Sequence, residues 1–317
     1  MQKNEQNIQQ TWLQMTSIKI GAAICLPVLM IGQQLGKTYG FGRAIAAIII
    51  GNGLLFLLGL IKAKMSYENK ANTIENAVGY FGSAGSKILA LNMIISRIGW
   101  FAIQLSLMVL SVIKSCELIM HIPLNPLPIT IVLGLIMTLV GLYGITALNR
   151  LCDLSMPLLL CTIAYLVYQA YTTGVESVGG DFVDSYQGVS LVIAAAILAV
   201  VDLPTYYRFA RSKKDSFISI TLLFVVAIPA LEAIGAYIGM RNGGANLIDS
   251  LTMHGSISGQ IWILLFLVFA GWTTNNGNLY SAAVALERIL PGRSLAVRTM
   301  IMGSIGTLAA CTSFGSC

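Results

Sequence analysis

The chain alternates between long apolar runs and short polar connections along nearly its whole length. An α-helix needs about 20 mostly apolar residues to cross the hydrocarbon core of a bilayer. The predicted spans are Ile18–Leu35, Ala44–Ile61, Ile88–Ile113, Pro128–Ile145, Leu151–Tyr171, Val189–Phe209, Phe217–Met240, Ile261–Leu286 and a last run that begins at Leu295. A transmembrane β-barrel would instead show segments of about ten residues with alternating polarity. We therefore predict an all-α polytopic membrane protein with about nine transmembrane helices.

Two of the predicted spans, the first and the sixth, contain residues that interrupt helices. Gly21 and Pro27 lie in the first run, and Asp202 and Pro204 lie in the sixth. Proline removes a backbone donor, which a membrane tolerates only where a cavity or a neighbour satisfies the freed carbonyl groups. Discontinuous helices at matching positions of two halves are typical of inverted-repeat transporters, which bind their ligand near the bilayer midplane.

This symmetry predicts the domain organisation of the chain. Residues 1–17 would form a cytoplasmic tail, and residues 18–317 one transmembrane transporter domain. Within that domain we expect a first repeat at about residues 18–171 and an incomplete second repeat at about residues 188–317.

Composition and charge agree with this class and predict an orientation. Hydrophobic residues make up 56% of the chain and charged residues 10%, whereas soluble domains carry roughly 25% charged residues. With the N-terminus inside, thirteen of the 19 Lys and Arg residues fall in cytoplasmic segments, four fall outside, and Lys19 and Arg97 lie within spans. Basic residues accumulate on the cytoplasmic side of a membrane. We therefore predict a multi-pass protein of the plasma (inner) membrane with a cytoplasmic N-terminus and an external loop at Thr172–Gln187.

The eighth predicted span carries hydrogen-bonding side chains in its middle, at Thr273, Thr274, Asn275 and Asn276. At about 100° per residue these four point to all sides of a helix, so protein or a wet cavity must surround it. Buried polar groups at this depth are costly and are functional candidates by default. The alternative is interhelical hydrogen bonding, because Thr and Asn also join neighbouring helices. We expect a binding site here.

The third predicted span places Arg97, Trp100 and Gln104 on one helical face about 60° wide. An indole ring offers a plane on which a flat ligand can stack, while a guanidinium group and an amide can bind its polar edge. The alternative interpretation pairs Arg97 with Asp202 or Glu232 as a structural ion pair. Both interpretations can hold, because a paired arginine can still line a cavity.

A cation site is predicted beside the eighth span. The main-chain carbonyl of Ala270 and the hydroxyls of Thr273 and Thr274 lie within about 100° of one another on a helix. Hard monovalent cations prefer such oxygen ligands, and the interrupted first span would free further carbonyls near Gly21 and Ile24. Glu232, in the middle of the seventh span, is the rival coupling group, because a buried carboxylate can carry a proton instead. A structural role for Glu232 is the alternative.

Several motifs resemble the nucleobase:cation symporter-1 family, and in particular its cytosine permease group. The resemblance covers essentially the whole chain. The matching segments are Trp272–Tyr280 (WTTNNGNLY), Ile50-Gly51-Asn52, Gly99-Trp100-Phe101 and Tyr207–Arg211 (YRFAR). The family implies a LeuT-type inverted-repeat fold and cation-coupled uptake of a nucleobase or a related nitrogen heterocycle, such as a cytosine, purine, hydantoin or hydroxymethylpyrimidine compound.

The resemblance also implies roles for individual residues. Trp100 would stack on the ligand, Asn275 and Asn276 would bind its polar edge, and Gln104 matches an amide found in the hydantoin-permease branch. The cation, expected to be Na⁺, would bind the carbonyl groups of Gly21, Ile24 and Ala270 and the hydroxyls of Thr273 and Thr274. The expected partners are the small heterocycle and the lipid bilayer, without nucleic acid, and the expected state is a monomer.

The sequence departs from the family pattern in three ways. Arg97 stands where the cytosine permease has an amide, which favours a more carbonyl-rich or anionic ligand. Val189–Val201 lacks the aromatic residue that the family places there, so an aromatic sandwich around the ligand is in doubt. The chain also ends within its ninth predicted helix, where the family continues, which predicts a C-terminal truncation.

The sequence also leaves alternatives to a Na⁺-coupled transporter. A proton-coupled permease of the same class and a truncated, non-transporting permease remnant are the alternatives. A membrane-embedded enzyme is the weaker one, because the sequence offers no metal-ligand cluster, no Ser/Lys or Ser/His pair and no paired aspartates at one depth. The six cysteines form no CxxC motif, so we expect neither zinc nor disulfides.

Overall fold

The computed structural model describes residues 8–172, 185–241 and 257–314. Apart from an isolated bridge between Gln10 and Ala210, these residues form helices joined by short connections. The helices are α2 (Trp12–Ala23), α3 (Leu26–Tyr39), α4 (Phe41–Asn69), α5 (Thr73–Met120), α6 (Pro126–Gly141), α7 (Gly144–Thr172), α8 (Ser185–Val201), α9 (Leu203–Tyr207), α10 (Lys213–Thr221), the π-helical turn η2 (Leu222–Ala227), α11 (Ile228–Arg241), α13 (Ile257–Leu286) and α14 (Leu295–Thr312).

Each of the nine predicted spans coincides with a helix or a broken helix. Seven spans in the described residues are long and apolar enough to cross a membrane, and the bent pair of α2 and α3 makes an eighth. The ninth, α6, is apolar but has only 16 residues. The prediction of an all-α polytopic fold is therefore confirmed, with a shorter fourth span than expected. Helix α2 also starts at Trp12, six residues before the predicted run, because Thr11 and Gln14 form a capping box there.

Both predicted interruptions are present. The chain leaves helical geometry at Ile24 and Cys25, and α2 and α3 are bent by 58° relative to each other. Pro27 lies in the first turn of α3, where its missing N–H has no intrahelical partner to lose. In the sixth span Asp202 separates α8 from α9, and Pro204 lies in the first turn of α9. The two broken spans thus place non-helical backbone in the interior of the molecule.

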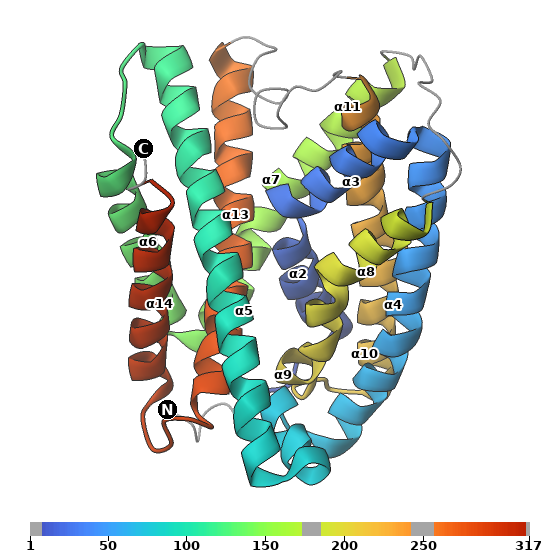
Figure 1. Ribbon diagram of the computed structural model, residues 1–317, viewed down its shortest axis with the longest axis vertical. Coiled ribbons are helices and arrows are strands. Elements are labelled where there is room, and N and C mark those ends of the chain that lie inside the picture. Colours follow the sequence, from blue (N-terminus) through green and yellow to red (C-terminus); the bar gives the residue numbers. More distant parts are fainter. Residues whose placement is uncertain (1–7, 173–184, 242–256, 315–317) are drawn as a thin grey trace.

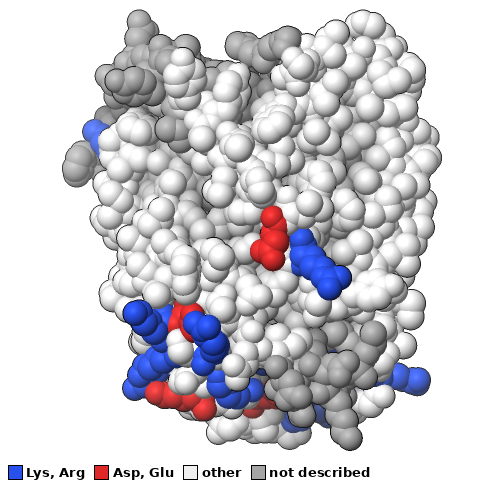
Figure 2. Space-filling model, turned by 180° about the vertical axis from the view of Figure 1, so that it is seen from behind, with Lys and Arg blue, Asp and Glu red and all other residues white. Residues whose placement is uncertain are grey.

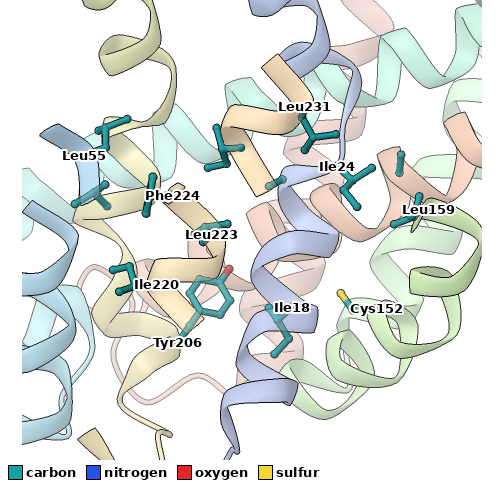
Figure 3. Packing of buried hydrophobic residues seen from close by; sticks show 14 of the residues in the cluster. Ile18, Ile24, Leu55, Cys152, Leu159, Tyr206, Ile220, Leu223, Phe224 and Leu231 are labelled. Carbon is teal, nitrogen blue, oxygen red and sulfur yellow. The ribbon is translucent and has the colours of Figure 1, made fainter. Parts of the chain in front are cut away.

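The helices form two packed groups with α2 between them (Figure 1). One group consists of α5, α6 and α14, and the other of α3, α4, α8, α10 and α11. Helix α13 packs against α5 of the first group and also against α2 and α7, so it links that group to α2. A large apolar cluster surrounds α2, where Ile18, Tyr206 and Leu223 lie together (Figure 3). A second cluster fills the space between α5, α6, α13 and α14.

Helices α3 and α11 touch backbone to backbone through glycine residues. A Cβ atom added at Gly32 would lie 1.9 Å from the carbonyl oxygen of Glu232, and one added at Gly36 would lie 2.0 Å from that of Ala236. On α11, a Cβ atom added at Gly235 would likewise collide with the carbonyl oxygen of Leu29, and one added at Gly239 with that of Gln33. Small residues allow such close approach of helices in membranes. This seam joins α3, the second half of the broken first span, to α11.

The surface charge is concentrated at one end of the molecule. Figure 2 shows most of the visible Lys and Arg side chains near the lower end, with acidic and basic atoms side by side in an otherwise uncharged middle. At that end, Arg211 pairs with Asp215 and Lys213 with Glu68. The connection between α4 and α5 lies at the same end in Figure 1. Most of the predicted external loop, residues 173–184, lies outside the described residues.

Candidate functional site

A cavity of about 130 Å³ lies at the break between α2 and α3. Its walls come from α2, α3, α5, α8, α9, η2, α11 and α13. A cavity of roughly 150 Å³ can hold a benzene ring in another protein, so this space fits one small ring. The lining is mostly apolar, with polar groups contributed chiefly by Lys19, Arg97, Gln104, Glu232 and Asn278. Such a mixture is typical of a small-molecule site.

Arg97 is both paired and part of the cavity wall. Its Nη2 donates to Oδ2 of Asp202 at 2.9 Å and to the carbonyl of Leu198 at 3.0 Å, while Nη1 donates to Oδ1 of Asn278 at 3.3 Å. The predicted alternative, an ion pair with Asp202 or Glu232, is therefore correct for Asp202. Because Arg97 also lines the cavity, the two interpretations hold together. The broken sixth span makes this possible, since Asp202 sits at the break.

Trp100 and Gln104 line the same cavity, as their shared helical face predicts. Gln104 is buried, and its Nε2 has no hydrogen-bond partner among the described residues. A buried amide donor without a partner costs free energy comparable to a lost hydrogen bond. Helix α8 contributes Ala195, Ala196, Leu198 and Ala199 to the cavity wall, and therefore no aromatic ring.

Asn275 and Asn276, the two asparagines that the sequence predicts to bind the ligand, are not among the residues that line this cavity. The Nδ2 of Asn275 donates to the carbonyl of Phe101 at 3.2 Å and contacts Sδ of Met137 at 3.6 Å, between α13, α5 and α6. Asn276 is buried, and its side chain has no partner among the described residues. Because α13 is a continuous helix, another stripe of it faces the cavity, containing Thr274, Gly277 and Asn278.

Four of the five predicted cation-site residues come together where α2 meets α13. The hydroxyl of Thr273 donates to the carbonyl of Gly21 at 2.7 Å and to that of Ala270 at 3.1 Å. The hydroxyl of Thr274 donates to the carbonyls of Ala22 and Ala270, both at 2.9 Å. This oxygen cluster contains only neutral hydroxyl and carbonyl groups, and their chemistry fits a hard monovalent cation. Thr274 also lines the cavity, so the cluster and the cavity share a residue.

Ile24, the fifth predicted residue, stands at the C-terminal end of α2. Its N–H donates to the carbonyl of Ile20 at 2.8 Å, and no hydrogen bond joins it to α13 in the described part of the chain. The break leaves the backbone of Ile24 outside regular helical geometry. The structure thus brings Gly21, Ala270, Thr273 and Thr274 together and places Ile24 at the neighbouring break.

Glu232 reaches the cavity from α11, just after the π-helical turn η2. The Nδ2 of Asn52, on α4, donates to its Oε2 at 2.6 Å. Both side chains are buried. Glu232 thus has a structural partner in Asn52. Glu232 also lines the cavity.

Four cavity-lining residues with polar side chains are not among the ligand-binding candidates of the sequence: Lys19, Cys25, Tyr206 and Asn278. Lys19 carried a usable signal, because a cation within a membrane span is rare and marks functional positions. Tyr206 lies directly beside the motif that begins at Tyr207, but its orientation depends on the short helix α9. Asn278 belongs to the polar stretch of the eighth span, and only the rotation of that helix decides that it faces the cavity.

Comparisons with known proteins agree with this architecture. The chain is 24% identical over 318 residues to the cytosine permease of Escherichia coli strain K12. The alignment covers 96% of this chain and 72% of that permease. The cytosine permease of Escherichia coli O157:H7 matches with the same identity and coverage. These relatives are permeases, and none is an enzyme.

Solved structures show the same fold. Mhp1, a nucleobase-cation-symport-1 family transporter in a closed conformation with bromovinylhydantoin bound, superposes with a TM-score of 0.81 at 21% identity, over 95% of this chain and 73% of Mhp1. A Na⁺-coupled sialic acid symporter in an outward-open state superposes with a TM-score of 0.73 at 15% identity, over 96% and 74% of the two chains. The predicted LeuT-type fold is confirmed. Residues 2–314 match the family of permeases for cytosine/purines, uracil, thiamine and allantoin, and the chain therefore belongs to this nucleobase:cation symporter family of multi-pass membrane transporters.

Proposed function

We propose that this protein is a secondary active transporter that takes up a nucleobase or a related nitrogen heterocycle together with Na⁺. The observation that carries the proposal is the shared wall between the cavity and the oxygen cluster. Thr274 contributes its side chain to both, so a cation held there would lie next to a bound ring. When two sites are in contact, binding at one can change the affinity of the other, and each ligand then changes the affinity for the other by the same factor.

The ligand would be a planar ring stacked on Trp100. Gln104 and Asn278 line the same cavity and offer amide groups to the edge of the ring. The Nε2 of Gln104 and the Nδ2 of Asn278 have no partner among the described residues, so a ligand can supply the missing acceptors. This assignment replaces Asn275 and Asn276 with Asn278 as the asparagine that binds the ligand.

The cation would be held by Gly21, Ala270, Thr273 and Thr274, with Ile24 adjacent at the break. These residues supply neutral oxygens, which suit a dehydrated Na⁺ and do not take up a proton at physiological pH. When bound, the ion would supply positive charge beside the ligand. The residues of this chain would fix the ion between α2 and α13, and so hold the broken first span against the eighth.

Proton coupling is the second candidate, because Glu232 lines the cavity and is buried. A carboxyl group in such a place can bind and release a proton as the cavity opens to either side. The Nδ2 of Asn52 donates a hydrogen bond to this carboxyl group. The two candidates make different predictions for the same binding measurement.

The test begins with a thermal-shift screen of the purified protein against nucleobases, hydantoins and hydroxymethylpyrimidine. The affinity of the best ligand is then measured in Na⁺ and in choline, at two pH values. Thr273→Val should abolish the dependence on Na⁺, whereas Glu232→Gln should retain it. Thr221→Val is the matched control, because Thr221 bonds only within its own helix. Affinity that ignores Na⁺, varies steeply with pH and loses that variation in Glu232→Gln would assign the coupling to protons.

A further inference from the structure

Lys19 places an unpaired ammonium group in the cavity. The residue lies on α2, is 8% exposed and lines the cavity together with Trp100 and Gln104. Its Nζ lies 3.7 Å from the ring centroid of Tyr206, as a cation–π contact. Within the described part of the chain, no hydrogen bond or ion pair reaches this ammonium. Lysine is almost never buried without a partner, and a bound group with hydrogen-bond acceptors would complete the hydrogen bonding of this ammonium.

The neighbouring Asp202 is already engaged and cannot easily serve as that partner. Its carboxylate accepts four hydrogen bonds, from Arg97 at 2.9 Å, Ser281 at 2.5 Å, Thr205 at 2.6 Å and Thr73 at 3.3 Å. Glu232, the other carboxylate of the cavity wall, is bonded to Asn52. Neither carboxylate lies within 4.0 Å of Lys19.

The Tyr206 ring also holds Lys19 in place. The hydroxyl of Tyr206 donates to the carbonyl of Gly277 at 2.7 Å and lies 2.8 Å from the hydroxyl of Ser281. Both anchor groups belong to α13, so the ring cannot rotate without losing them. The ammonium rests on one face of this ring (Figure 3 shows the ring beside α2). The N–H donors that point away from the ring therefore remain available to a molecule in the cavity.

We propose that Lys19, with Arg97 beside it, selects a planar heterocycle that carries negative charge at neutral pH. An acidic ring or a ring with a carboxylate would supply the acceptors that Lys19 lacks. Hydrogen bonds between charged groups are stronger than those between neutral groups. A neutral, amino-bearing ring would leave the ammonium buried and unpaired. This inference rests on the proposed function, because it names the substrate class of the same cavity.

The experiment compares uracil with orotate, which is the same ring bearing one carboxylate, and with barbiturate, an acidic ring of similar size. Affinities are measured in Na⁺ by calorimetry for the purified full chain and for Lys19→Met, Lys19→Gln and Lys19→Arg. The wild type should bind at least one of the two acids at least about tenfold more tightly than uracil. Lys19→Met and Lys19→Gln should abolish this preference, and Lys19→Arg should keep it. Lys64→Met, in an exposed position, controls for a general loss of positive charge.

The possible outcomes separate this inference from the proposed function. Equal affinity of the wild type for uracil and both acids would overturn the inference and leave a heterocycle transporter intact. The same holds if Lys19→Met weakens uracil and the acids by one common factor. Binding of none of the three rings, nor of any base or hydantoin in the screen, would contradict the proposed function itself. Melting temperatures of the variants establish that each one is folded.

Discussion

The guanidinium group of Arg97 is held by the carboxylate of Asp202, whose side chain is fully buried. Removing one partner of a buried ion pair leaves an uncompensated charge and costs about 3–5 kcal/mol. We expect Arg97→Gln to lower the melting temperature in detergent, and the double variant Arg97→Gln/Asp202→Asn to recover part of the loss. A double variant no more stable than Arg97→Gln alone would show that the pair contributes nothing to the fold.

Trp100 is the residue on which a flat ligand can stack. Stacking of an aromatic side chain on a base contributes about 1–3 kcal/mol, so Trp100→Ala should weaken ligand binding by roughly tenfold or more. Trp100→Phe should retain most of the affinity, since it keeps a ring. Trp262→Ala is the control, because Trp262 is 41% exposed and bonds to Thr162 outside the cavity. Unchanged affinity in a folded Trp100→Ala protein would contradict stacking.

At the scale of the elements, the glycine seam between α3 and α11 sets the position of the broken first span. A Cβ atom at Gly32 would overlap the backbone of Glu232, whereas one at Gly53 on α4 would meet nothing within 4 Å. Gly32→Ala should therefore destabilise the protein by roughly 1–3 kcal/mol. Gly53→Ala should be neutral or slightly stabilising, because alanine favours the helix. Equal melting temperatures for the two variants would mean that the seam can relax.

The spans and their breaks could be predicted from the sequence, but the rotation of the helices could not. Long apolar runs and the residues Pro27 and Pro204 were enough to predict the spans and both breaks, since length and proline geometry act locally. The rotation of α13 was not predictable, because it depends on which neighbours the helix meets. Asn275 therefore turned out to face Phe101 and Met137. For the same reason the sequence marked Lys19 as a buried cation without revealing that it faces the cavity.

At the scale of the whole molecule, the predicted orientation can be tested directly. The turn between α5 and α6 and the turn between α13 and α14 should lie on opposite sides of the membrane. Ile122→Cys should react with a membrane-impermeant thiol reagent in intact cells, while Arg293→Cys should react only after lysis. Both positions are exposed, so access and not burial decides the outcome. The reverse labelling pattern would place the N-terminus outside.

The central claim is that one cavity couples a heterocycle to a cation during transport. Uptake into proteoliposomes, driven by an inward Na⁺ gradient, measures this coupling most directly. If one Na⁺ enters with each neutral ligand, an inside-negative potential adds about 2.3 kcal/mol per 100 mV to the driving force of the gradient, whereas entry of Na⁺ with a monoanionic ligand moves no net charge and is driven by the gradient alone. We predict accumulation of the ligand above its outside concentration with Na⁺, and none in choline or with Thr273→Val. Equal uptake in Na⁺ and choline, ending at equal concentrations inside and outside, would contradict the account.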